Sequence, residues 1–196
     1  NNLKKVTQNY HVIALRNFLK YLAKRDIKSV SAEKVELGKQ EDREVTFLER
    51  DELDRLLNAP EGGGLDALRD KALLTTLFST GMRVSEAQAL DRDKIDIKRG
   101  EVSIRGKGGK IRVVFLSDMT KKLLNQYLNK RVDADPALFI RIPRSKNFSK
   151  ESDLRLTPRS IQRIVGKNPT KAGIVGKNVR PHTFRPSYAT HQLRNG

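Results

Sequence analysis

The sequence predicts a mainly α-helical α+β protein, in which a small helical piece precedes a larger mixed unit. Three observations support this prediction. Apolar residues recur at helical spacing over residues 4–24 and again over 65–80. Short apolar runs between residues 95 and 115 are separated by glycine turns, which is typical of a small three-stranded antiparallel sheet. A polar stretch at residues 37–46 separates the two parts and suits a linker.

The other helices are expected between residues that typically begin or end them. Ser31 suits the N-cap of a short helix, and Pro60 closes a helix predicted over residues 49–57. Gly81 follows the apolar pattern of 65–80 and is expected to end that helix as its C-cap. Residues 141–156 are expected to form a basic loop. Further helices are predicted over residues 84–90, 118–130, 157–166 and 182–194.

Positive charge is concentrated towards both ends of the chain. The formal net charge is +17, and the sequence pI is about 10.3. Residues 1–35 carry 8 basic and 2 acidic side chains, residues 36–100 carry 11 and 15, and residues 101–196 carry 21 and 6. Solubility alone does not require this imbalance, whereas a polyanion is attracted by it through long-range electrostatics and counterion release. The distribution therefore favours nucleic acid as the partner.

The composition excludes several other kinds of site. The 196 residues include no cysteine, so the chain has no disulfide framework and no thiolate metal site, which fits a reducing cytoplasm. No apolar run approaches the length of a transmembrane helix, and a membrane is not expected as a partner. The sequence offers no ligand cluster for a metal and no nucleotide motif, so we expect no cofactor.

Two segments carry basic residues at predicted corners. Arg83 stands between two predicted helices; alone, it is an ordinary surface arginine that could pair with Glu86 one turn later. The turn over residues 105–112 is rich in glycine and contains Lys107. Alone, it is a hairpin with solvated lysines. It is not a phosphate-binding P-loop, because it lacks the GxxxxGK[ST] pattern and joins strands.

The last predicted helix begins with His182 and Arg185, whose spacing places both side chains on one face. Alone, His182 could simply cap the helix.

The three segments together resemble the tyrosine recombinase family of phage integrases, especially its Xer-like members. Thr-Gly-Met-Arg-Val-Ser-Glu is similar to the family's first arginine motif. Gly-Lys-Gly-Gly-Lys-Ile-Arg-Val-Val-Phe-Leu is similar to the β-hairpin with its catalytic lysine, and His-Thr-Phe-Arg to its HxxR motif. Order and spacing agree, and the resemblance covers nearly the whole chain. It implies site-specific DNA recombination by strand cleavage and rejoining through a 3′-phosphotyrosyl intermediate, without metal or nucleotide.

The resemblance also implies a role for each candidate residue. Arg83 and Arg185 would clamp the phosphate, and Lys107 would protonate the leaving 5′-oxygen. His182 would assist proton transfer at the nucleophile. Glu86 would not contact the DNA itself but would orient a catalytic side chain.

The domain organisation implied by the resemblance has two parts. Residues 1–36 would be part of a helical, SAM-like core-binding domain, residues 37–46 a linker, and residues 47–196 a catalytic domain that is incomplete at its C-terminal end. The two domains would close around double-stranded DNA, and full-length members of the family assemble as tetramers on DNA. We therefore expect a cytoplasmic, nucleoid-associated protein.

The chain departs from the family pattern in two respects. Pro186 stands where the family usually has histidine, although proline is tolerated in a first helical turn. The family's nucleophilic tyrosine follows a Leu-Gly-His-type motif, and neither lies within residues 1–196. Tyr188 falls where the family has a buried aromatic, so we expect it in the core. This chain is therefore expected to bind DNA without cleaving it.

Three alternatives have different sequence support. A type IB topoisomerase uses a similar set of catalytic residues, but the residues within the three motifs resemble those of Xer-like recombinases. A non-catalytic DNA-binding protein derived from the recombinase fold agrees with the missing tyrosine. An RNA-binding or ribosomal protein agrees with the charge but not with the motifs.

Overall fold

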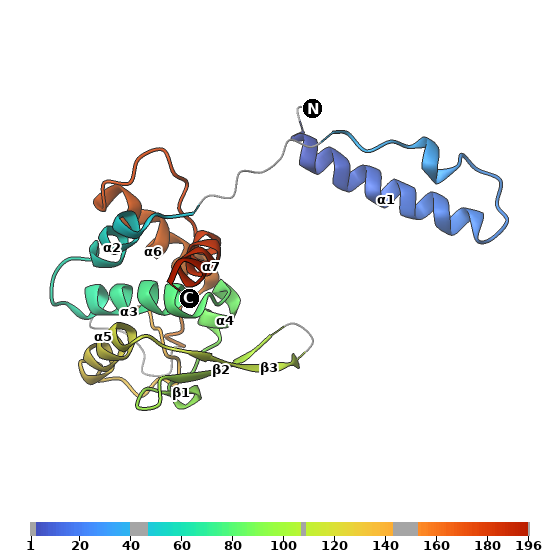
Figure 1. Ribbon diagram of the computed structural model, residues 1–196. Coiled ribbons are helices and arrows are strands. Elements are labelled where there is room, and N and C mark those ends of the chain that lie inside the picture. Colours follow the sequence, from blue (N-terminus) through green and yellow to red (C-terminus); the bar gives the residue numbers. More distant parts are fainter. Residues whose placement is uncertain (1–2, 40–46, 107–108, 143–152, 196) are drawn as a thin grey trace. The chain divides into compact units, whose positions relative to one another are not determined.

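The computed structural model describes residues 3–39, 47–106, 109–142 and 153–195. It divides the chain into two compact units, Asn1–Glu44 and Val45–Gly196 (Figure 1). The division falls inside the predicted linker, of which residues 40–46 lie outside the described residues. The predicted fold class, mainly helical α+β with a three-stranded antiparallel sheet, is confirmed.

The N-terminal unit consists of α1 (Lys5–Ala23), the 3-10 turn η1 (Ala32–Lys34) and the chain that returns along the helix. Asn9 fastens this return. Its Nδ2 donates to the carbonyl oxygen of Gly38 at 2.7 Å, and its Oδ1 accepts from the Gly38 N–H at 2.9 Å. The apolar face expected on this helix is present but solvent-exposed within the unit, as its four largest members show: Tyr10, Ile13, Phe18 and Tyr21.

The C-terminal unit contains most of the predicted elements, and most helix bounds agree with the prediction within two residues. In chain order the elements are α2 (Arg50–Asn58), α3 (Leu65–Thr80), α4 (Val84–Gln88), η2 (Arg92–Lys94), β1 (Ile95–Asp96), β2 (Glu101–Arg105), β3 (Ile111–Phe115), α5 (Asp118–Asn129), α6 (Pro158–Lys171), η4 (Pro181–Thr183) and α7 (Phe184–Asn195).

Helix α3 is the centre of this unit. It packs against α5 and β3 on one side and against α2 and α7 on the other (Figure 1). Polar residues within the helix are satisfied locally, since the Thr76 hydroxyl donates to the Ala72 carbonyl oxygen at 2.7 Å. The apolar side chains of α3 form much of the core, and four of its apolar residues are completely buried: Ala72, Leu73, Leu74 and Leu77.

The sheet has the order β1-β2-β3, and both pairings are antiparallel. Val102 and Ile104 of β2 face the core, and their partners in the register are Val114 and Arg112 of β3. Because side chains alternate along a strand, the other face of β3 points away from the core. It is apolar and exposed at Ile111, Val113 and Phe115.

Two regions differ from the prediction. Helix α6 continues to Lys171 rather than ending at 166. Pro169 lies inside the helix and is buried. It has no N–H to donate, but the Ala172 N–H still donates to the Asn168 carbonyl oxygen at 2.9 Å, so the helical path is kept to its end. The second region is the expected basic loop over residues 141–156. Where the structure describes its two ends, backbone hydrogen bonds join them in an antiparallel bridge. The Arg141 N–H donates to the Leu154 carbonyl oxygen at 2.7 Å, and the Leu156 N–H to that of Phe139 at 3.1 Å.

We expect Asn9→Ala to release the chain around Gly38 from α1. The substitution removes two hydrogen bonds, each with a net contribution of about 1 kcal/mol. Protection of the Gly38 amide against hydrogen exchange should fall by about tenfold. Gln8→Ala is the control, because the Gln8 side chain bonds locally to the Leu3 carbonyl oxygen. Unchanged Gly38 protection in Asn9→Ala would show that other contacts hold the return segment.

Candidate active site

The end of α3 determines where Arg83 lies. Gly81 adopts a left-handed conformation with φ of 57°, and its N–H donates to the Leu77 carbonyl oxygen at 3.1 Å. The predicted glycine C-cap is therefore confirmed. The turn leads directly into α4, for which Arg83 is the N-cap residue. The backbone at Gly81 is also close to α7, because a Cβ there would lie 3.4 Å from the Tyr188 ring.

Arg83 and Glu86 form the ion pair that their spacing permits. The Arg83 backbone N–H donates to Glu86 Oε2 at 2.7 Å, and its Nη1 donates to Oε1 at 3.3 Å. The Glu86 side chain is 6% exposed, whereas that of Arg83 is 56% exposed. The buried carboxylate thus anchors the arginine on its protein side, and most of the guanidinium stays accessible to a ligand.

A second arginine binds the same carboxylate and was not predicted. Arg112 of β3 donates from Nη1 to Glu86 Oε1 at 3.0 Å and from Nη2 to Oε2 at 2.8 Å. Burial raises the pKa of Glu86, but the hydrogen bonds from Arg112 and from the Arg83 backbone outweigh it and hold the pKa below its ordinary value of 4.5. Glu86 is therefore a charged acceptor that positions other groups, and it is unsuited to donate a proton.

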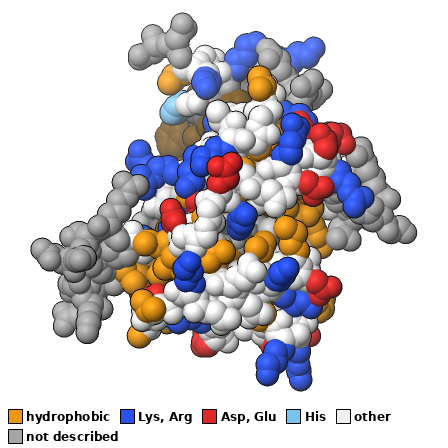
Figure 2. All heavy atoms as spheres, turned by 90° about the vertical axis from the view of Figure 1, so that its left-hand side faces the viewer, with side chains coloured by type: hydrophobic (Ala, Val, Ile, Leu, Met, Phe, Trp, Pro, Cys, Tyr) orange, Lys and Arg blue, Asp and Glu red, His pale blue; other side chains and the backbone are white. Residues whose placement is uncertain are grey.

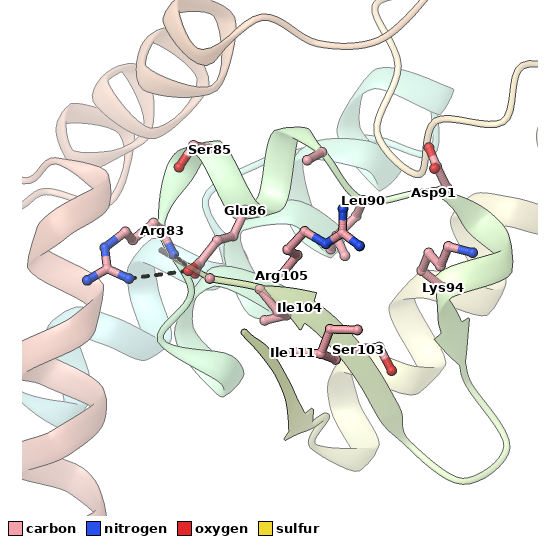
Figure 3. Close-up of a pocket in the computed structure, with 12 residues that line it drawn as sticks. Arg83, Ser85, Glu86, Leu90, Asp91, Lys94, Ser103, Ile104, Arg105 and Ile111 are labelled. Carbon is pink, nitrogen blue, oxygen red and sulfur yellow. Dashed lines mark hydrogen bonds and ion pairs between the residues drawn. The ribbon is translucent and has the colours of Figure 1, made fainter. Parts of the chain in front are cut away.

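A cleft of about 930 Å³ lies between α4 and the sheet (Figure 3). Arg105 points into it and, among the described residues, has no hydrogen-bond or ion-pair partner. Arg83 projects in a different direction, with Glu86 between the two arginines. The predicted general acid, Lys107, follows Gly106 in the sequence but lies outside the described residues. The lining also includes Ser85, Asp91, Lys94, Ser103, Gly106 and Ile111.

His182 and Arg185 are both exposed, at η4 and in the first turn of α7. Buried Ser187 steadies this helix, because its hydroxyl donates to the Thr183 carbonyl oxygen at 2.8 Å and accepts from the Leu48 N–H at 2.9 Å. Pro186 is the third residue of α7 and does not interrupt it, as expected for a proline in the first turn.

The two arginine segments meet through Tyr188. Its ring packs edge-on against Phe78, with ring centroids 6.4 Å apart, and also abuts Gly81. Arg185 precedes Tyr188 by three residues and so lies on the same side of α7. Tyr188 was expected in the core, but it is only partly buried and packs at the end of α3.

His182 lines a second hollow, of about 610 Å³, together with Val84, which follows Arg83. One wall is α6, which contributes Gln162, and the same helix exposes Arg159 and Arg163. Sequence reasoning missed this basic face. The signal was present, because basic side chains recur at a spacing of four in a helix whose opposite residues are apolar.

The side of the C-terminal unit where α2 and α5 lie carries charges of both signs. There, Lys and Arg side chains stand among Asp and Glu side chains and hydrophobic patches (Figure 2). Such mixed charge gives weak attraction for a polyanion.

The described residues contain no group of three or more histidine, aspartate or glutamate side chains that could hold a metal ion. Within the same residues, no helix is both long and apolar enough to span a membrane.

Comparison with known proteins gives consistent matches. Residues 46–196 match the model of the phage integrase family. Tyrosine recombinase XerC of Syntrophus aciditrophicus (strain SB) is 33% identical over 196 residues, which cover 99% of this chain and 63% of that protein. The chain spans about 63% of the length of the curated relatives it matches.

Two of the solved structures with the same fold are complexes with DNA. The XerH site-specific recombinase bound to palindromic difH substrate, in a post-cleavage complex, has a TM-score of 0.74 and 25% identity, over 99% of this chain and 58% of that one. A lambda integrase tetramer bound to a Holliday junction has a TM-score of 0.71 and covers 95% of this chain and 54% of that one; at 16% identity this likeness concerns the fold alone.

We expect Glu86→Gln to destabilise the protein in a pH-dependent way. Near neutral pH the loss of charged hydrogen bonds should lower the free energy of unfolding by about 2 kcal/mol. Because the pKa of Glu86 is lowered in the folded state, its contribution is complete above the ordinary value of 4.5 and is lost as pH falls through the folded pKa.

The measurement is urea unfolding of both proteins between about pH 7 and about pH 3, where the difference should shrink with falling pH. Glu61→Gln, at an exposed carboxyl group, is the control for the loss of one negative charge. A difference that stays constant over this range would mean that the carboxylate charge is not what Glu86 contributes.

Proposed function

The chain belongs to the phage integrase family of tyrosine recombinases, and we propose that it supplies the DNA-binding and phosphate-activating part of a site-specific recombinase. The observation that carries the proposal is the corner where α3 ends. The exposed guanidinium of Arg83, anchored by Glu86, stands there beside the helix that bears Arg185. Two arginines that bind together there would suit a phosphodiester, which presents two charged non-bridging oxygens.

In the proposed reaction, a tyrosine hydroxyl oxygen attacks the phosphorus atom, and the bond to the 5′-oxygen breaks. Arg83 and Arg185 bind the non-bridging oxygens and stabilise their charge in the transition state. Lys107 gives its proton to the leaving 5′-oxygen, and His182 assists the transfer of the tyrosine proton. The 3′-phosphotyrosyl bond conserves the energy for rejoining, which is the reverse reaction with a new 5′-hydroxyl.

Duplex DNA is the proposed partner of the C-terminal unit. The basic face of α6, with Arg159 and Arg163, borders the hollow that His182 lines, so one duplex could contact both. These contacts would be mainly to phosphates and would position the duplex rather than read its sequence. The whole protein is proposed to act in the cytoplasm on the nucleoid, as a tetramer on DNA.

The first test is the salt dependence of duplex binding. The affinity of the 196-residue chain should fall with added salt, with a slope of log K against log salt of about −0.9 for each phosphate contact. Arg185→Ala should weaken binding and reduce the magnitude of the slope by about one. Arg55→Ala removes the same charge from exposed α2 and should leave the slope unchanged. An affinity that is independent of salt would contradict the proposal.

The second test concerns covalent chemistry, because none of the four tyrosines lies in a segment that resembles the family's nucleophile motif. Tyr127 is fully buried; its hydroxyl accepts from the Ile140 N–H at 3.3 Å, and burial raises its pKa. Tyr188 packs against the end of α3. Tyr10 and Tyr21 belong to the N-terminal unit. We therefore expect the chain to bind DNA without forming a covalent adduct.

A suicide duplex, nicked near the crossover site, and a denaturing gel measure this adduct. The 196-residue chain should give none, whereas a longer version that includes the family's tyrosine motif should give one. An adduct from the shorter chain that disappears in Tyr188→Phe would refute the packing role of Tyr188 and place the nucleophile within α7.

A further inference from the structure

We propose that Arg112 is a positioning residue for the proposed reaction: it holds Arg83 through Glu86 and packs against Gly106 at the end of β2. The inference rests on the proposed function and adds to it a link between a phosphate-binding arginine at the start of α4 and the sheet. Arg112 itself touches neither the reacting phosphate nor the leaving group in this proposal.

The first part of the evidence is the sharing of one carboxylate. Glu86 Oε1 accepts from Nη1 of both arginines, at 3.0 Å from Arg112 and 3.3 Å from Arg83. Oε2 accepts from Arg112 Nη2 at 2.8 Å and from the Arg83 backbone N–H at 2.7 Å. Four donors thus fill about four acceptor positions, which is the capacity of a carboxylate. Displacing Arg112 would open one acceptor position on each oxygen, so the carboxylate could turn and change the anchorage of Arg83.

The second part of the evidence is the contact between Arg112 and the turn. A Cβ on Gly106 would lie only 3.2 Å from Arg112 Nη1, so the guanidinium packs closely against this glycine. The Gly106 N–H donates to the Lys110 carbonyl oxygen at 2.8 Å, and the Gly109 N–H to that of Gly106 at 3.2 Å. Gly106 immediately precedes Lys107. The base of the turn is therefore braced by the same guanidinium that binds Glu86.

The chemistry of arginine explains why this residue type is suited to the position. The planar guanidinium bonds to both carboxylate oxygens along one edge, which fixes its orientation as well as its distance. An ammonium group is a point charge that cannot reproduce this two-point contact. Arg112 would otherwise be a structural ion pair that joins α4 to the sheet. The two roles differ in one measurable respect, because a positioning role requires that Arg112 changes what Arg83 contributes to phosphate binding.

A double-mutant cycle on DNA affinity measures that coupling. The 196-residue chain is titrated onto a mixed-sequence duplex of about 30 base pairs at low salt. We expect Arg83→Ala to raise Kd about tenfold in the wild-type background and about threefold or less in the Arg112→Gln background. Arg112→Lys keeps a positive charge beside buried Glu86 and serves where Arg112→Gln does not fold. It should also lose most of the coupling.

Arg99→Gln is the matched control. Arg99 is exposed, lies just before β2 in the same sheet and pairs with Asp96 at 3.8 Å. The substitution removes the same charge as Arg112→Gln, so Arg83→Ala should still cost about tenfold in this background. The amide signals of Gly106 and Gly109 provide a second readout by NMR. They should shift in Arg112→Lys and stay unchanged in Arg99→Gln.

Reduced coupling together with shifted glycine signals supports the positioning role. If Arg83→Ala costs the same factor in folded Arg112→Lys as in the wild type, Arg112 is a structural ion pair and the inference is wrong, while the proposed function stands. If Arg83→Ala has no effect on DNA affinity in the wild type, Arg83 does not bind phosphate, and both the proposed function and the inference fail.

Discussion

The fold of the C-terminal unit depends on the burial of α3, which is surrounded by α2, α5, α7 and β3. Leu73, Leu74 and Leu77 have no solvent exposure, so the helix cannot shift without opening cavities that are costly at native packing density. The buried Asp70 carboxylate of this helix is also compensated, because it pairs with Arg69 and with Lys167, each at 2.6 Å. A helix held in this way has a fixed end. The site is built at that end, where a single left-handed residue redirects the chain.

Local signals made much of this fold predictable. The span of α3 and its glycine cap follow from apolar periodicity and from the need for a left-handed residue at position 81. The strands follow from alternation and glycine turns. In contrast, the clasp between Asn9 and Gly38 joins residues 29 positions apart, and no local pattern announces it. The extension of α6 past Pro169 was missed because burial in the core decides it, and burial is a tertiary property.

The candidate site shows the same division. Motif order and residue type identified Arg83, Glu86, His182 and Arg185, and the structure places Arg83 and Glu86 in direct contact. Their relation to Arg112 could not be predicted, because it depends on how β3 lies under α4, 26 residues away in sequence from Glu86. Arg105 and the basic face of α6 were also missed, since exposed basic residues are common in a chain of this charge. Geometry distinguishes them by placing them at hollows that contain candidate residues.

The outer face of β3 has a consequence for how molecules of this protein behave towards one another. Within the described residues β3 is an edge strand, and its exposed face is apolar. Such edges tend to pair with strands of other molecules unless charge keeps them apart. The net charge of +17 supplies that repulsion in dilute salt. Added salt shortens its range to a few ångströms, about 3 Å at 1 M. Colloidal stability and release from a polyanion thus respond to ionic strength in opposite directions, because the charge that attracts one partner is also what separates the copies.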